Sequence, residues 1–120
     1  MDSVSGWGTV PRLHVVSRFQ IQEENTFWGD QLRAAAELME SQVGCDAVTV
    51  GRATDDPRFW VLTSEWESVG AYRRALSSFD VKVLGVPVLS TAVDEPSAFE
   101  VLYAKRDGRE TEATSARAPS

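Results

Sequence analysis

Two aromatic residues six positions apart are the side chains of this sequence best suited to contact a small molecule. Trp66 ends an extended apolar run, and Tyr72 lies in the helical pattern that starts within two residues of it. An indole and a phenol each offer a flat apolar surface and one hydrogen-bonding group. Such a pair either completes an ordinary core or lines a pocket in which a ligand reacts, and both interpretations stay open at this point.

Few other residues offer catalytic or metal-binding chemistry. The single cysteine, Cys45, has no partner for a disulfide or a cysteine metal site, and we expect it to be a small buried apolar residue. Asp55 and Asp56 stand before Pro57, which is typical of a turn, because two adjacent carboxylates without further ligands rarely bind a cation. We therefore predict no metal site.

Composition and charge exclude several classes of function. The chain has 120 residues, enough for one domain, and its net charge of -6 argues against nucleic acid as a partner. No apolar run reaches the roughly 18 residues that a membrane span needs, and the N-terminus does not resemble a secretory signal. We expect a cytoplasmic protein that binds neither nucleic acid nor membrane.

The periodic part of the sequence lies between two tails. Residues 1–11 and 105–120 lack apolar periodicity, so we predict a flexible N-terminal tail, a domain over residues 12–104 and a disordered C-terminal tail. Within the domain, alternating patterns predict strands and 3.6-residue patterns predict helices. The predicted strands are 13–21, 46–53, 59–66 and 97–104, and the predicted helices are 25–43 and 68–79.

The boundaries of these elements carry local signals. Asn25 or Thr26 can cap the first helix, Gly44 can end it in the left-handed conformation, and Ser68 can cap the second helix. In the second helix, the side chains expected to form the buried stripe are Val69, Tyr72, Leu76 and Phe79. Residues 80–96 are apolar but broken by Gly85, Pro87 and Pro96, which predicts a packed loop with a short helical turn.

The order of elements is βαββαβ, which predicts an α+β fold of the ferredoxin-like type with a four-stranded antiparallel sheet. Two helices cover only one face of such a sheet, yet the strands are apolar on both faces. On 59–66, Phe59 and Val61 share one side, whereas Trp60, Leu62 and Trp66 share the other. A second copy of the same sheet is the simplest cover for the remaining face, so we predict a homodimer in which two subunits form a dimeric α+β barrel.

Several of these features together resemble a known family. A strand that ends in Glu65-Trp66 runs straight into a helix with Ala71-Tyr72, and Gly44-Cys45 opens the preceding hairpin. This resembles the antibiotic biosynthesis monooxygenase (ABM) family of dimeric α+β barrels over roughly residues 12–104. The resemblance implies a pocket between the sheet and its helices, and several members oxidise phenolic or quinol-like aromatics with O₂ without a metal, flavin or haem.

The haem-degrading branch of the family fits the sequence poorly. Its tryptophan matches Trp66, but its asparagine aligns with Ser17 and its histidine with Leu76, which cannot bind iron. The only histidine, His14, is predicted on the strand face opposite Ser17. The sequence therefore predicts no haem.

The branch that acts on aromatic polyketides fits better. Trp66 and Tyr72 match its two aromatic side chains and become the predicted catalytic pair, although Leu62 replaces its polar asparagine. The residues predicted to bind substrate are Ser17, Phe19, Trp28, Leu62, Ser64, Leu76 and Phe79. The first hypothesis is a cofactor-independent monooxygenase for a hydrophobic aromatic or quinol-type small molecule. The alternative is a non-catalytic dimeric barrel that binds a small apolar ligand or a partner protein.

Overall fold

A four-stranded antiparallel sheet forms one layer of the molecule. The computed structural model describes residues 11–22 and 26–116, so the predicted N-terminal tail lies almost entirely outside the described residues. The strands of the sheet are β1 (Leu13–Gln20), β2 (Cys45–Arg52), β3 (Phe59–Trp66) and β4 (Ala98–Glu100). Their order is β2-β3-β1-β4, which confirms the predicted ferredoxin-like α+β fold.

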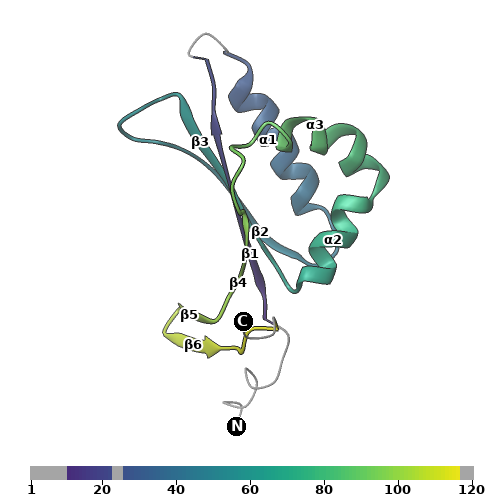
Figure 1. Cartoon of the computed structure of the whole chain (residues 1–120), viewed down its shortest axis with the longest axis vertical. Coiled ribbons are helices and arrows are strands. Elements are labelled where there is room, and N and C mark those ends of the chain that lie inside the picture. Colours follow the sequence, from purple (N-terminus) through teal and green to yellow (C-terminus); the bar gives the residue numbers. More distant parts are fainter. Residues whose placement is uncertain (1–10, 23–25, 117–120) are drawn as a thin grey trace.

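The helices form the second layer and cover one face of the sheet (Figure 1). They are α1 (Trp28–Glu40), α2 (Val69–Ser77), a short π-helical turn η2 (Val81–Gly85) and α3 (Val86–Leu89). The segment after α2 is thus more helical than its glycine and prolines suggest. Pro87 is tolerated because it stands in the first turn of α3, where a backbone N–H has no helical partner.

The alternation predicted along the strands holds in the sheet. Leu13, Val15 and Phe19 of β1 are buried against the helices, as are Leu62 and Trp66 of β3. These side chains divide into two clusters, one around Trp66 and the other around Phe19. The core therefore lies wholly between the sheet and the helices.

The start of α2 is defined by a side-chain cap and by the close approach of the helix to Gly44 at the start of the hairpin. The Ser68 hydroxyl accepts a hydrogen bond from the backbone N–H of Ala71 at 3.1 Å, which confirms the predicted cap. Gly44 has φ +91°, and a Cβ added there would lie 2.6 Å from the Cβ of Ala71. Gly44 is thus required both by its backbone conformation and by the close approach of α2.

The start of α1 differs from its prediction. Phe27 occupies the N-cap position and no side chain caps the helix there. Thr26 is therefore not a cap, and Asn25 lies outside the described residues. The first turn of α1 instead contains the acidic residue Asp30, which interacts favourably with the positive end of the helix.

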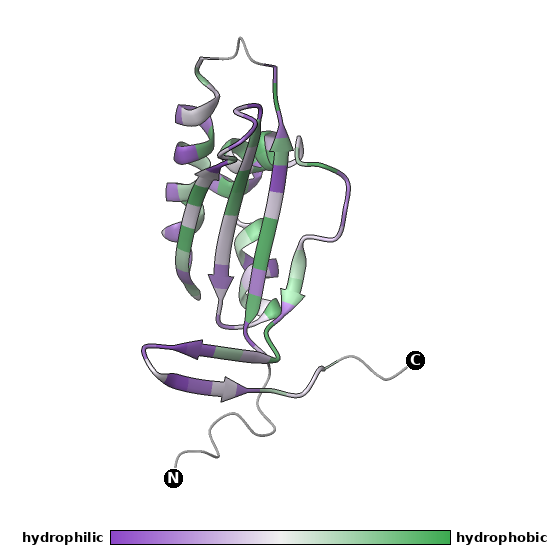
Figure 2. Ribbon diagram, turned by 90° about the vertical axis from the view of Figure 1, so that its left-hand side faces the viewer, coloured by the Kyte–Doolittle hydropathy of each residue, from purple (hydrophilic) through white to green (hydrophobic). Residues whose placement is uncertain are grey.

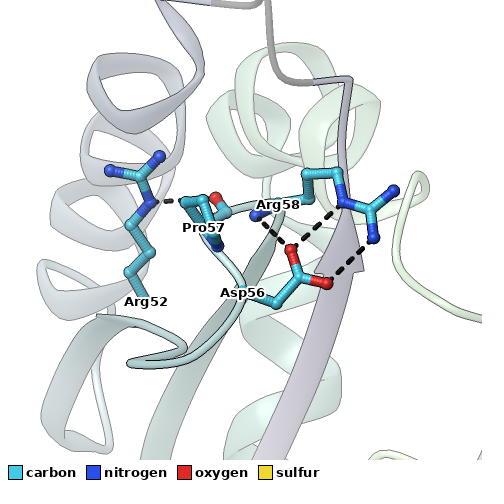
Figure 3. Close-up of polar contacts among 4 residues, drawn as sticks. All are labelled: Arg52, Asp56, Pro57 and Arg58. Atoms are coloured by element: carbon cyan, nitrogen blue, oxygen red, sulfur yellow. Dashed lines mark hydrogen bonds and ion pairs between the residues drawn. The ribbon is translucent and has the colours of Figure 1, made fainter.

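The turn between β2 and β3 is organised by one carboxylate (Figure 3). Asp56 accepts hydrogen bonds from the backbone N–H and the guanidinium of Arg58, at 2.9 to 3.1 Å. The pKa of the Asp56 carboxyl lies below its usual value, chiefly because Arg58 donates to it. On the other side of the turn, Arg52 Nε donates to the carbonyl of Pro57 at 2.9 Å. Asp56 is engaged in the turn, as predicted from the sequence.

Phe79 is not on the buried stripe of α2, contrary to prediction. The helix ends at Ser77, and Ser78 is extended with ψ 151°, so the helical spacing is interrupted before Phe79. Its side chain is 77% exposed. Val69, Tyr72 and Leu76 do pack against the core, together with the fully buried Ala71 and Ala75.

The C-terminal part also differs from the sequence prediction. The predicted strand 97–104 is shorter, because β4 ends at Glu100 and the chain turns into a separate hairpin. Its strands are β5 (Tyr103–Arg106) and β6 (Arg109–Glu112), so regular structure extends into residues 105–120, where we predicted a disordered tail. Asp107 and Gly108 form the turn with positive φ, a conformation that favours hairpins. The hairpin lies apart from the main sheet, below it in Figure 2.

Within residues 11–22 and 26–116, no helix covers one face of the sheet (Figures 1 and 2). This open face carries apolar side chains such as Val16 and Val61, both half-buried, and Phe99, which is 48% exposed. Polar side chains such as Thr63 and Glu65 lie between them. The open face is therefore mixed in polarity, whereas the face that packs on the helices is almost entirely apolar.

Candidate ligand pocket

A pocket of about 260 Å³ lies on the helix side of the sheet. Its walls come from β1, β3, α1, α2, α3 and the connection that leads to β4. The lining residues are Val15, Ser17, Met39, Leu62, Ser64, Tyr72, Leu76, Val86, Leu89, Ser90, Ala92, Val93, Glu95 and Ser97. Most of them are apolar, with a few polar groups among them, which is the usual character of a small-molecule site.

The sheet contributes two serines to this pocket. In the register of β1 and β3, Ser17 lies opposite Leu62, and Val15 lies opposite Ser64. The two serines are therefore diagonal neighbours on one face of the sheet, a placement that brings side chains within about 7–8 Å. Ser64 is buried, with 6% of its surface exposed, whereas Ser17 is half-buried.

Helix α2 contributes Tyr72 and Leu76, which are one helical turn apart and share a face. The ring of Tyr72 packs on that of Trp66, with centroids 5.4 Å apart and planes tilted by 55°. Burial raises the pKa of the Tyr72 hydroxyl above its ordinary value. Because an ordinary tyrosine already titrates near 10, this hydroxyl is protonated at neutral pH and can donate a hydrogen bond.

Trp66 lies behind the pocket and not in its wall. Its side chain is fully buried, and its indole Nε1–H donates to the Ser64 hydroxyl oxygen at 2.8 Å. The predicted pair Trp66 and Tyr72 is therefore close together, but only Tyr72 lines the cavity. Trp66 acts on the cavity through the groups that it touches, Tyr72 and Ser64.

Three of the residues predicted to bind substrate do not line this pocket. Phe19 and Trp28 pack on each other in the second core cluster, with ring centroids 5.2 Å apart. Phe79 is exposed beyond the end of α2. The structure thus brings Ser17, Leu62, Ser64, Tyr72 and Leu76 together at the pocket and leaves these three aromatic rings outside it.

Several lining residues were missed by the sequence interpretation, most of them in α3 and in the connection to β4. Val86 and Leu89 have the i, i+3 spacing of a helix face, a signal that the neighbouring Pro87 obscured. The connection follows the outer edge of β1, where the Val93 N–H donates to the Arg18 carbonyl and the Val16 N–H to the Ser97 carbonyl, both at 2.7 Å. It closes this side of the pocket.

Glu95, from the segment 80–96 that was predicted to be a packed loop, contributes a carboxylate to the lining of the pocket. Arg18 donates to both of its oxygens, from Nε at 2.7 Å and from Nη2 at 2.8 Å. This bidentate pair lowers the pKa of the Glu95 carboxyl below its usual value, with the hydrogen bonds as the main cause. The group is therefore ionised and a weak base. Glu65, by contrast, lies on the open face and pairs with Arg106.

A second hollow, of about 360 Å³, lies between the β5–β6 hairpin and the ends of β1 and β3. Its walls are largely ionic: Arg106 pairs with Glu65 at 2.5 Å, and Arg12 pairs with Asp46. The helix-side pocket is the better candidate for an apolar ligand, because its lining is mainly aliphatic.

Within the described residues, no three His, Cys, Asp or Glu side chains stand close enough to form a metal site. The helices in the described part of the chain are all too short or too polar to cross a membrane.

Comparison with known proteins defines the family of this fold and site. The profile named "Antibiotic biosynthesis monooxygenase" (ABM) matches residues 12–84. This match spans more than half of the sequence, and the chain belongs to the ABM family. No curated protein matches the sequence at a significant level.

Solved structures share the fold at low sequence identity. SnoaB, a cofactor-independent oxygenase from Streptomyces nogalater, is 19% identical with a TM-score of 0.65, over 77% of this chain and 94% of SnoaB. A conserved protein from Methanosarcina mazei Go1 is 19% identical with a TM-score of 0.62, over 76% and 93% of the two chains. An antibiotic biosynthesis monooxygenase is also 19% identical, with a TM-score of 0.58 over 72% and 93%.

Proposed function

We propose that this protein is a cofactor-independent monooxygenase that oxidises a hydrophobic aromatic or quinol-type small molecule with O₂ in the pocket beside Tyr72. The observation that carries the proposal is an apolar cavity of about 260 Å³ with hydroxyl groups from Ser17, Ser64 and Tyr72 in its walls. Such a site can hold an aromatic ring system by its faces and contact its oxygen substituents with hydroxyls. Membership of the ABM family supports the same reaction class.

The chemistry can be written for an anthrone-type ring system. A CH₂ group between the rings loses a proton to give a carbanion, which transfers one electron to O₂. The two radicals combine into a C–O bond and give a peroxide anion, which takes up a proton from water. The resulting hydroperoxide loses water to leave a carbonyl. One oxygen atom of O₂ ends in the product and the other in water.

The pocket contributes binding and electrostatics to these steps. Tyr72, whose hydroxyl is protonated at neutral pH, can donate to the substrate oxygen on which negative charge develops. The aliphatic walls exclude water from the carbanion. Glu95 is a weak base because it is paired with Arg18, so the substrate has to be acidic enough to release its proton to water at the mouth of the pocket, before the walls exclude water from the carbanion. This requirement favours substrates whose carbanion or phenolate is delocalised over several rings.

Oxygen consumption tests the proposal directly. The purified protein is mixed with hydroxynaphthalenes and anthrones, and O₂ uptake is followed together with product formation. We expect uptake with at least one ring class, a loss of about tenfold or more in Tyr72→Phe, and no loss in Arg73→Ala, an exposed residue of α2 outside the pocket. Saturable binding without O₂ uptake by any member of the panel would refute the catalytic proposal.

A non-catalytic ligand-binding barrel is the second candidate function. Its support is the lack of a strong base among the described lining residues: the ion pair with Arg18 lowers the pKa of Glu95 and makes its carboxylate a weaker base, and the Tyr72 hydroxyl is protonated at neutral pH. A pocket of this kind binds an apolar molecule or supports assembly with a partner protein without reacting. Binding of the same aromatic panel with no O₂ uptake, or co-purification of a partner protein, would favour it.

We also propose that the protein acts as a homodimer joined through the open sheet face. The support is that no helix in the described part of the chain covers this face, which leaves Val16, Val61 and Phe99 partly in contact with solvent. A second sheet would bury them and complete a dimeric α+β barrel. The pocket lies on the other side of the sheet, so each subunit would keep its own.

A further inference from the structure

The Ser64 hydroxyl has an unused hydrogen-bond donor at the pocket wall. A serine hydroxyl carries one proton and two lone pairs, whereas an indole Nε1–H can only donate. Trp66 occupies a lone pair of Ser64 at 2.8 Å, so the hydroxyl proton must point elsewhere. Among the described residues, the hydrogen bond recorded at the Ser64 hydroxyl is the one that it accepts from Trp66, and the hydroxyl proton has no recorded acceptor.

Burial makes this unused donor costly. Ser64 is 6% exposed and Trp66 is fully buried, so bulk water reaches the hydroxyl only through the pocket. A buried polar group left without a partner destabilises the state that contains it. A ligand that brings an acceptor atom to this point keeps the donor paired, whereas a ligand without one displaces water and leaves the donor unpaired.

We propose that Ser64 is the fixed hydrogen-bond donor of the pocket and selects ligands that present a keto or phenolate oxygen to β3, with Trp66 as the positioning residue. Ser64 supplies the contact, and the Trp66 N–H prevents the hydroxyl from turning its proton toward the core. This inference rests on the proposed pocket function and names its ligand class: a compact ring system with an acceptor oxygen at one edge.

The surroundings of Ser64 fit such a ligand. Leu62 precedes it on the same strand face, and Leu76 projects from α2, so two aliphatic side chains border the donor. Tyr72 adds a second hydroxyl that is protonated at neutral pH. The cavity volume of about 260 Å³ is slightly smaller than that of most ligand pockets, which span roughly 300–1,000 Å³. Two fused rings are therefore suitable probes.

A pair of probes isolates the contact. 1-Tetralone carries a ketone that can only accept a hydrogen bond, and tetralin has the same ring skeleton without the oxygen. Calorimetric titration of the full-length protein should show that 1-tetralone binds about tenfold more tightly than tetralin, as expected for one satisfied buried hydrogen bond. Equal affinities in the wild-type protein would overturn the proposal without the need for any variant.

Variants then assign the preference to Ser64. Ser64→Ala should reduce it to about twofold or less by weakening 1-tetralone alone, and Ser64→Thr, which keeps a hydroxyl, should retain it. Trp66→Phe removes the N–H and should reduce the preference while tetralin affinity stays within about twofold. The matched control is Thr63→Ala, which removes a hydroxyl from the opposite face of the same strand. An unchanged preference in Ser64→Ala, or an equal loss in Thr63→Ala, would contradict the assignment.

Oxygen uptake separates this inference from the proposed function. A preference for 1-tetralone that depends on Ser64, in a protein that consumes no O₂ with any substrate, leaves Ser64 as the donor and refutes the oxygenase. Oxygen uptake together with equal affinities for the two probes refutes the role of Ser64 alone.

Discussion

The ring of Tyr72 packs at a tilt of 55° on that of Trp66, with centroids 5.4 Å apart, so the last residue of β3 touches the helix that follows it. One partner of this pair is fully buried in the core and the other lines the pocket. This ring contact therefore links the packing of the core to the shape of the pocket. Substitution of Trp66 should mainly reduce folding stability, whereas removal of the Tyr72 hydroxyl should mainly change ligand binding.

Tyr72→Phe should change ligand binding more than stability at neutral pH. It keeps the ring that packs on Trp66 and removes a hydroxyl that no described residue hydrogen-bonds, so the free energy of unfolding should change by less than about 1 kcal/mol. Urea unfolding at pH 8 measures this change. A larger loss at pH 8 would mean that the hydroxyl contributes to the fold.

The same variant should alter the alkaline limit of stability. The pKa of Tyr72 is raised in the folded state. The protonated hydroxyl therefore contributes fully to folding stability below the pKa of the unfolded state, near 10, and this contribution is lost as the pH rises through the pKa of the folded state. Tyr72→Phe should therefore lose less stability than the wild type between about pH 9 and pH 11. Identical alkaline slopes in the two proteins would contradict the shift.

Trp66→Ala should destabilise the fold strongly, whereas Phe79→Ala should not. Removal of a fully buried tryptophan costs about 3–5 kcal/mol through lost burial and the cavity left behind. Phe79 is 77% exposed, so its truncation should stay within about 0.5 kcal/mol. Chemical unfolding of both variants measures the two costs. A cost above about 2 kcal/mol for Phe79→Ala would show that the Phe79 side chain is buried in the core.

Gly44→Ala should cost more than Gly108→Ala, although both glycines have positive φ. At Gly108, φ is +77° and nothing lies within 4 Å of an added Cβ, so only backbone strain of about 1 kcal/mol is expected. At Gly44, φ is +91° and the added Cβ would also meet Ala71 at 2.6 Å. Thermal unfolding measures both. In the double variant Gly44→Ala/Ala71→Gly, the total loss of stability should be smaller than the sum of the losses of the two single variants, because the clash is relieved. A loss equal to that sum would rule out the clash.

Local patterns predict the sheet and its main helices because the signals are short-range. Alternation places Leu13, Val15 and Phe19 on the buried face, and Ser68 stands at the start of α2 with the side chain that caps it. The hydroxyl and aliphatic residues of β1, β3 and α2 that line the pocket follow from the same periodicity.

The positions of the other side chains depend on three-dimensional contacts that the spacing of residues in the sequence does not encode. Phe79 continues the helical spacing of Tyr72 and Leu76, but the extended Ser78 ends the periodicity one residue earlier. Trp66 has the position of a pocket residue, yet whether it faces the cavity or the core depends on Ser64 and Tyr72 in three dimensions. Glu95 enters the pocket wall because a long connection folds back along β1, a non-local event that its turn-like sequence conceals.

Arg18→Gln should loosen the wall of the pocket formed by that connection. The pKa of Glu95 is lowered by Arg18, so it should rise toward its ordinary value in the variant. In the wild type, the ion pair contributes to folding stability at pH values above the pKa of Glu95 in the unfolded state. This contribution is lost as the pH falls through the lower pKa of Glu95 in the folded state. A carboxyl titration by NMR measures the shift, and hydrogen exchange at the Val93 amide, which donates to the Arg18 carbonyl, reports the loosening. Unchanged titration and exchange would show that the pair does not hold this wall.

Val61→Arg should convert the proposed homodimer into monomers. Val61 stands on β3 between Arg18 of β1 and Gly51 of β2, so its side chain lies in the middle of the open face. A charge buried there without a partner would cost several kcal/mol at an interface, and a neighbouring Arg18 would add repulsion. Light scattering should give a dimer for the wild type and a monomer for the variant.

The control for this substitution is Arg73→Glu, which changes the charge on the exposed side of α2 and should leave the dimer intact. Because the pocket lies on the other side of the sheet, the Val61→Arg monomer should still bind 1-tetralone if each subunit holds a complete site. A monomeric wild-type protein would refute the proposed dimer. A Val61→Arg variant that remains dimeric would show that the subunits meet at another surface. Loss of binding in a folded monomer would instead show that the second subunit stabilises the pocket through the sheet that the two chains share.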